Sequence, residues 1–254
     1  MSKETLTNEN PSAVQGEEGV VILKQDAPFV LKEAYKTLRT NVVFALPGEG
    51  TKIIGVTSGT TGEGKSTTAL NLAISFGQVG ERVLLLEGDL RLPSLGKKLR
   101  IPSRPGLTDL LTGASSSQEA IRQTEHGIDI LTAGSLPRDP SPLLTSKRME
   151  ALFDQLRGYY THIIVDLPPI GTVSDAAVLS RMIDGYILVV RHNNSEYKDL
   201  ARALRQMEFV NANILGVVYN DADIHTRKGY GYRRYGYRRY GKGYGYGYGY
   251  GYGK

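Results

Sequence analysis

Three glycines, a lysine and a serine follow one another closely in the stretch SGTTGEGKSTT, from Ser58 to Thr68. The spacing Gly59-x4-Gly64-Lys65-Ser66 is that of a P-loop, in which glycines let several backbone N–H groups converge on phosphate oxygens. We expect Lys65 to reach the β- and γ-phosphates of ATP and the Ser66 hydroxyl to bind Mg²⁺. The predicted nucleotide-binding residues of this loop are Gly59, Thr60, Thr61, Gly62, Glu63, Gly64, Lys65, Ser66 and Thr67.

Acidic residues end two other apolar stretches. HIIVD ends in Asp166, whose carboxylate could bind Mg²⁺ together with Ser66. RVLLLEGDLR contains Glu87 and Asp89, followed by Arg91. Because residues i and i+2 of a strand point the same way, we expect both carboxylates to face the phosphates, where they could hold Mg²⁺ or accept a proton. The alternatives are that Asp166, or one acid of the pair, caps the turn that follows it.

Apolar runs alternate with helical patterns along the chain, which predicts an α/β fold with a doubly wound, mostly parallel sheet. Ligands of such sheets bind beyond the carboxyl ends of the strands, where the acids above lie. The expected strands span residues 52–58, 82–89, 127–134, 162–169, 184–191 and 213–220. The expected helices span residues 29–46, 63–79, 143–159, 172–182 and 195–210.

Composition divides the 254 residues into a core and two flanks. We expect a flexible arm over residues 1–28, a P-loop domain over residues 29–226 and a disordered tail over residues 227–254. The chain has no cysteine, and it shows neither the apolar run of a signal peptide nor a stretch of roughly 20 apolar residues that could span a bilayer. These features predict a cytoplasmic protein.

The tail is built from ten glycines, ten tyrosines and eight basic residues. The chain has 31 Lys and Arg and 26 Asp and Glu, and since the tail holds eight of the bases and no acid, residues 1–226 hold 23 bases against 26 acids. Such a basic tail favours an anionic partner, and interleaved Arg, Gly and Tyr could bind single-stranded nucleic acid or a membrane surface. Its tyrosines are Tyr230, Tyr232, Tyr235, Tyr237, Tyr240, Tyr244, Tyr246, Tyr248, Tyr250 and Tyr252.

Four segments in this order resemble the bacterial tyrosine kinases that control capsule and exopolysaccharide synthesis: EAYKTLRTN, SGTTGEGKSTT, LLLEGDLR and IIVDLPP. These kinases belong to a larger group of P-loop ATPases that includes partition and septum-placement proteins, which are the alternative assignment. The resemblance implies ATP- and Mg²⁺-dependent autophosphorylation of the tail tyrosines in trans. It assigns catalysis to Lys65, Glu87, Asp89, Arg91 and Asp166, the metal to Ser66, Asp89 and Asp166, and a contact with the base to Asn220.

The same resemblance implies the partners. Glu33, Lys36, Arg39 and Asn41 would join subunits into a ring, although Glu33 and Lys36 also have the spacing of a simple surface pair. The cytoplasmic end of a membrane activator of chain-length control would recruit the kinase to the inner face of the plasma membrane. A cognate tyrosine phosphatase would reverse the modification, and no nucleic acid is expected.

The chain departs from the family pattern at two positions, Glu87 and Thr61, and at Thr60 it differs from the partition ATPases. Glu87 stands where the family usually has Asp, so either Glu87 is the base, or Asp89 takes this role, or the enzyme is slow. On this basis we expect Glu87→Asp to preserve or raise the rate. Thr61 replaces a common proline, and Thr60 stands where partition ATPases carry a second lysine, which favours the kinase.

Overall fold

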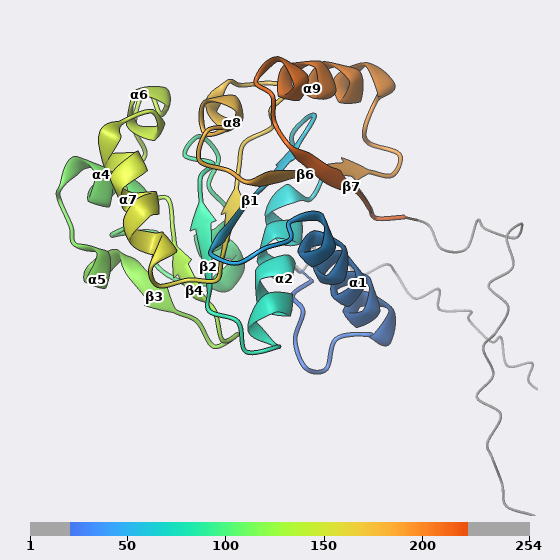
Figure 1. The fold of residues 1–254 in the computed structure, drawn as a ribbon, viewed down its shortest axis with the longest axis horizontal. Helices are drawn as coiled ribbons and strands as arrows, with labels where there is room; N and C mark the ends of the chain where they lie inside the picture. The colour runs from blue at the N-terminus through green and yellow to red at the C-terminus, as the bar shows by residue number, and fades with distance from the viewer. Residues whose placement is uncertain (1–20, 223–254) are drawn as a thin grey trace, which may run out of the picture. The chain divides into compact units, whose positions relative to one another are not determined.

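The strands form a single seven-stranded sheet in the order β3-β4-β2-β5-β1-β6-β7 (Figure 1). The structure is a computed structural model that describes residues 21–222, so the predictions for residues 1–20 and for the tail tyrosines lie outside it. All neighbouring strands are parallel except β3 and β4. The strands are β1 (Lys52–Ser58), β2 (Val83–Glu87), β3 (Ile121–Gln123), β4 (Asp129–Leu131), β5 (His162–Asp166), β6 (Gly185–Arg191) and β7 (Ile214–Asn220).

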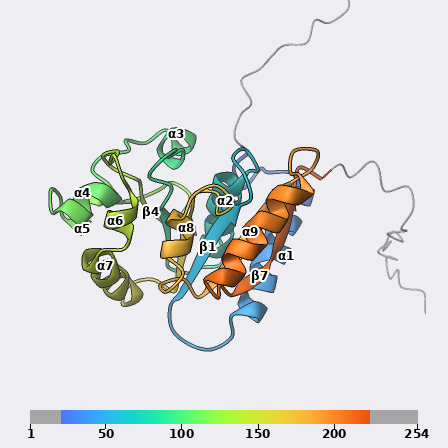
Figure 2. The same ribbon diagram turned by 90° about the horizontal axis from the view of Figure 1, so that it is seen from above.

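Helices cover both faces of the sheet, as predicted for a doubly wound fold (Figures 1 and 2). One apolar core joins the sheet to α1 (Phe29–Ala45) and α2 (Lys65–Gly77) and also includes Leu95 of α3 (Leu95–Leu99). The core on the other face includes residues of α4 (Leu107–Thr112), α7 (Lys147–Arg157), α8 (Asp175–Val178) and α9 (Tyr197–Phe209). The remaining helices are α5 (Ser117–Ala120) and α6 (Ser141–Leu144).

Several predicted elements are shorter than expected. The helix expected over residues 143–159 is divided, because Ser146 begins α7 by accepting a hydrogen bond from the Met149 amide at 3.2 Å. The helix expected over residues 172–182 is reduced to the single turn of α8. In α8 the Ala176 carbonyl accepts a hydrogen bond from the Tyr186 hydroxyl. The region between β2 and β4, for which the sequence predicts no helix or strand, contains α3, α4, α5 and β3. None of the helices within residues 21–222 is long and apolar enough to cross a membrane.

The last part of the expected N-terminal arm is packed against α2. Leu23 is buried, and its amide donates to the Asn71 carboxamide at 2.7 Å. The same side chain donates to the Val21 carbonyl at 2.9 Å. This end of the expected arm is therefore in contact with α2 through one buried apolar side chain and through backbone hydrogen bonds to Asn71.

Candidate nucleotide-binding site

The P-loop connects β1 to α2, as the sequence predicts. Gly62 and Gly64 adopt left-handed backbone conformations, with φ of 81° and 92°. A Cβ atom at Gly64 would lie 2.0 Å from the Asn220 amide nitrogen, so a side chain there would displace Asn220 as well as strain the left-handed backbone. The loop therefore requires glycine both for its turns and for the close approach of β7.

Glu63 and Asn220 hold the loop in shape. The Glu63 carboxylate is buried and accepts hydrogen bonds from the Thr60 amide at 3.0 Å and from the Ser195 hydroxyl. The Asn220 amide donates to the Glu63 carbonyl at 3.0 Å, which places the end of β7 against the loop. Glu63 is one of the predicted nucleotide-binding residues, and in this structure its side chain is used for hydrogen bonds within the protein.

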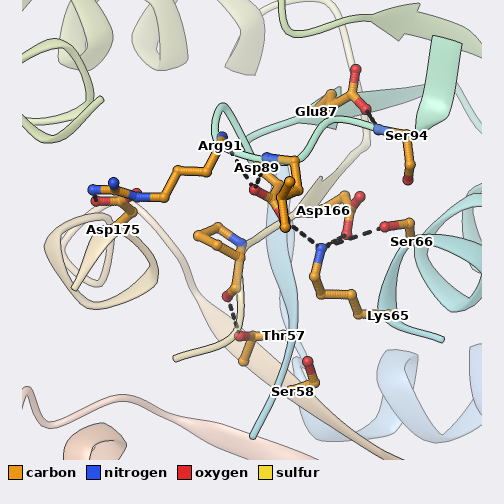
Figure 3. Close-up of polar contacts among 12 residues, drawn as sticks. Thr57, Ser58, Lys65, Ser66, Glu87, Asp89, Arg91, Ser94, Asp166 and Asp175 are labelled. Carbon is orange, nitrogen blue, oxygen red and sulfur yellow. Dashed lines mark hydrogen bonds and ion pairs between the residues drawn. The ribbon is translucent and has the colours of Figure 1, made fainter. Parts of the chain in front are cut away.

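Lys65 lies between two carboxylates at the carboxyl edge of the sheet (Figure 3). Its Nζ atom is 2.7 Å from Asp89 Oδ2, 3.5 Å from Asp166 Oδ1 and 3.5 Å from the Ser66 hydroxyl. Burial disfavours the charged ammonium, but the charges of Asp166 and Asp89 outweigh it and raise the pKa of Lys65 above its usual value. The predicted cation and the three predicted metal ligands are therefore in one place.

Asp166 is fully buried, and it lacks hydrogen-bond partners. Neither carboxylate oxygen accepts a hydrogen bond from any residue within 21–222, and the 3.5 Å approach of Lys65 is a loose ion pair. Burial raises the pKa of Asp166, while the charge of Lys65 opposes this shift. A buried carboxylate without donors is unfavourable unless a ligand satisfies it.

The chemistry of these donors fits Mg²⁺. Asp166 offers free carboxylate oxygens, and Ser66 offers a hydroxyl beside them. Within residues 21–222 no group of three or more His, Cys, Asp or Glu side chains could hold a metal ion. Mg²⁺ is usually bound through one or two carboxylates together with water and substrate phosphates. Mg²⁺ in this position would neutralise charge on the phosphates of a bound nucleotide.

The two acids at the end of β2, Glu87 and Asp89, do not point the same way, which corrects our expectation. β2 ends at Glu87, so Asp89 lies in the following loop, where the alternation of a strand no longer applies. Asp89 turns to Lys65, and its other oxygen accepts hydrogen bonds from the amides of Arg91 at 3.3 Å and Leu92 at 3.0 Å. The Glu87 carboxylate instead points away from Lys65, toward Ser94 (Figure 3). Burial raises the pKa of Glu87, against hydrogen bonds from backbone amides.

Arg91 is directed to α8. Its Nε and Nη2 atoms donate to the Asp175 carboxylate at 2.6 and 3.2 Å, and the Ser141 hydroxyl donates to the same group at 2.7 Å. Asp175 is buried, and the sequence offers no reason to single it out, because it falls inside the helix expected over residues 172–182 and its partner Arg91 is distant in the sequence. In this structure Arg91 thus anchors the Asp89 loop to α8.

The predicted oligomerisation residues lie on α1, which packs beside α2 and outside the nucleotide site (Figure 1). Glu33 and Lys36 form an exposed pair at 3.5 Å, as the simple surface interpretation expects, and Asn41 is also exposed. Arg39 donates to the carbonyl of Ser75, near the end of α2, and to its hydroxyl at 3.2 Å. Arg39 therefore caps the P-loop helix within the same chain.

The fold and the loop define the class of this protein as a P-loop NTPase. The ParA family model, described as "NUBPL iron-transfer P-loop NTPase", matches residues 49–234, which is most of the chain.

Curated relatives define the family within this class. The tyrosine-protein kinase YwqD of Bacillus subtilis (strain 168) is 36% identical over 213 residues, covering 84% of this chain and 90% of YwqD. The putative tyrosine-protein kinase EpsB of Ralstonia solanacearum is 37% identical over 203 residues, covering 79% of this chain but only 27% of EpsB. The chain belongs to the bacterial tyrosine-protein kinases.

Solved structures agree with this assignment. The kinase domain of Escherichia coli tyrosine kinase ETK matches with a TM-score of 0.73 at 29% identity, covering 85% of this chain and 80% of that one. The chimerical protein CapA2B2 matches with a TM-score of 0.71 at 36% identity, covering 74% and 83%. From the wider group of P-loop ATPases, the septum site-determining protein MinD of Pyrococcus horikoshii OT3, complexed with Mg-ADP, matches with a lower TM-score of 0.56 at 27% identity, covering 66% and 70%.

Proposed function

We propose that this kinase uses Mg-ATP to phosphorylate the tyrosines of its own tail, residues 227–254. The observation that carries the proposal is the cluster of Lys65, Asp89 and the unpartnered Asp166 at the P-loop, in a chain that also contains ten tyrosines within 28 residues. The Mg-ADP held by the related septum protein supports the choice of cofactor. Eight basic residues and no acid in the tail would favour its approach to these acids.

In the proposed reaction the tyrosine oxygen attacks the γ-phosphorus, the bond from that phosphorus to the bridging oxygen breaks, and ADP leaves with the electron pair. The phenolic proton passes to a carboxylate. Asp89 is better placed than Glu87 for this role, because its Oδ2 atom faces the site and becomes free once Lys65 turns to the phosphates. Lys65 and the loop amides would stabilise the charge that develops on the phosphoryl oxygens.

We further propose that transfer occurs in trans within a ring of subunits that meet at α1. Phe29, Val30 and Phe44 are exposed on this helix together with the charged pair of Glu33 and Lys36, so it offers both apolar and polar contacts. Arg39 stabilises α2 in the same chain, so its replacement would test the fold as well as assembly. Glu33 and Lys36 are the better positions for a variant that tests assembly alone.

The resemblance to capsule and exopolysaccharide kinases supports the remaining proposals. We propose that the kinase regulates polysaccharide synthesis. The cytoplasmic end of a membrane activator would recruit it to the inner face of the plasma membrane, and a tyrosine phosphatase would reverse the modification. Each phosphate adds about −1.5 to −2 charges, so several of them would reverse the charge of the tail. Phosphorylation would then repel the tail from the acids of the site and favour dissolution of the ring.

The proposal is tested by mass spectrometry of residues 227–254 after incubation of the purified full chain with Mg-ATP. Lys65→Met should lower the rate of tail phosphorylation at least about 10²-fold, because it removes the cation that the P-loop directs to the γ-phosphate. Lys147→Met, which removes an exposed lysine of α7, is the matched control and should label as the parent does. Undiminished labelling of the Lys65→Met chain would refute the proposed site.

A further inference from the structure

Glu87 is enclosed by backbone donors. Its side chain has no exposed surface. Oε1 accepts hydrogen bonds from the amides of Ser94 at 2.5 Å and Leu95 at 2.6 Å, and Oε2 accepts one from the Ala133 amide at 3.0 Å. Both oxygens are therefore used by the protein, and neither points to Lys65 (Figure 3).

These three donors come from two segments that flank the site. Ser94 and Leu95 begin α3, and Ala133 follows β4. The carboxylate thus joins the end of β2 to the start of α3 and fixes both ends of the loop that spans residues 88–94.

Asp89 depends on this loop. One of its oxygens accepts hydrogen bonds from the amides of Arg91 and Leu92, which belong to the same loop, and the other lies 2.7 Å from Lys65. A shift of the loop would therefore move the carboxylate that faces the P-loop. Displacements of about an ångström at such groups can cost about 10² in rate.

We propose that Glu87 is a positioning residue, which holds the loop of residues 88–94 and hence Asp89 against Lys65, and does not touch the reacting atoms. The inference rests on the kinase activity that the family assignment gives and not on the tail being the acceptor. It replaces the interpretation in which Glu87 is the base, and with it the expectation from the sequence that Glu87→Asp preserves or raises the rate.

Two variants of Glu87 distinguish a positioning residue from a catalytic base, because one keeps the length of the side chain and the other keeps its charge. Glu87→Gln is isosteric and keeps a carbonyl oxygen for Ser94 and Leu95, although its NH₂ group would face the Ala133 amide. Glu87→Asp keeps the carboxylate but withdraws it by about an ångström from all three donors. A positioning residue should tolerate Gln better than Asp. A catalytic base should tolerate Asp, and its loss to Gln should cost about 10² to 10⁴.

The experiment compares ADP release and phosphotyrosine formation by the full chain, with saturating Mg-ATP, for the parent, Glu87→Gln and Glu87→Asp. We expect Glu87→Gln to remain within about tenfold of the parent and Glu87→Asp to be slower than Glu87→Gln. Amide exchange by NMR provides a second readout, in which Ser94 and Leu95, which keep an oxygen acceptor in Glu87→Gln, should exchange faster in Glu87→Asp than in Glu87→Gln.

Asp184→Asn is the matched control. Asp184 also accepts a backbone hydrogen bond, from Ile53 at 2.7 Å, but it does so at the opposite end of β1 from the P-loop. This variant should change the unfolding midpoint and leave the turnover per folded molecule unchanged. A Glu87→Gln chain that turns over more slowly than Glu87→Asp would overturn the positioning role. A parent chain that releases ADP without labelling its tail would refute the proposed acceptor instead, and the amide-exchange comparison would remain valid.

Discussion

Glu87 and Asp166 are paired in register on the neighbouring strands β2 and β5, and both are fully buried, yet their surroundings are opposite. Glu87 accepts three backbone hydrogen bonds, whereas Asp166 accepts none from the described residues. The difference arises from the groups beyond the end of each strand, because the start of α3 lies over Glu87 while Lys65 and Ser66 lie beside Asp166. The presence or absence of hydrogen-bond donors therefore distinguishes Glu87, which holds the structure, from Asp166, which is free to bind a cation.

The largest effect should come from Asp166→Asn. We expect turnover to fall about 10²- to 10³-fold, because the side chain that would hold Mg²⁺ loses its charge. The free energy of unfolding without nucleotide should change by less than about 1 kcal/mol, since no hydrogen bond is lost and the loss of the 3.5 Å ion pair with Lys65 is offset by the removal of a buried charge. Steady-state kinetics and urea unfolding measure the two quantities. A loss of stability with normal turnover would show that Asp166 is the structural member of the pair.

Removal of the Glu87 side chain, unlike Asp166→Asn, should lower the stability of the fold. Glu87→Ala leaves three buried amides without an acceptor, and we expect a loss of about 2–5 kcal/mol in the free energy of unfolding. Urea unfolding of this variant and of Asp166→Asn under the same conditions gives the comparison directly. Equal losses in both variants would remove the distinction between the two carboxylates.

The smallest effect should come from Asp175→Asn, which weakens the attachment of the Asp89 loop to α8. The variant loses the charge that Arg91 contacts at 2.6 Å but keeps an oxygen acceptor, so we expect about 1 kcal/mol lower stability and a loss in turnover of less than tenfold. Glu196→Gln, in an exposed pair with Lys198, is the control and should change neither quantity. A larger loss in turnover than that of Asp166→Asn would place Arg91 in the catalytic step.

The parts of the site that are local in the sequence could be predicted from it. The P-loop and Lys65 follow from spacing, and Asp166 follows from an apolar run that ends in a carboxylate. The doubly wound fold follows from the alternation of strands and helices, although β3 was missed because its short sequence, IRQ, is not an apolar run and lies at an edge of the sheet.

The partners of Glu87 could not be predicted, because they are set by tertiary contacts. Ala133 lies far from Glu87 in the sequence. Every residue except proline has a backbone amide, so the type of residue does not indicate which amide will be the donor. The rule that residues i and i+2 share a face failed for Glu87 and Asp89 because β2 ends between them, and the ends of strands are poorly defined by propensity. The family resemblance assigns Arg39 to the subunit interface, and its contact with a helix carbonyl of the same chain could not be predicted from the sequence for the same reason.

The most direct test of the central claim is the affinity of the full chain for ADP with Mg²⁺ and with EDTA, measured by calorimetry for the parent, Asp166→Asn and Glu87→Gln. We predict that Mg²⁺ strengthens ADP binding to the parent and to Glu87→Gln by similar factors. Asp166→Asn should lose most of this gain, because its unpartnered carboxylate is the group that would meet the cation. A normal Mg²⁺ effect in Asp166→Asn, together with its loss in Glu87→Gln, would contradict the account.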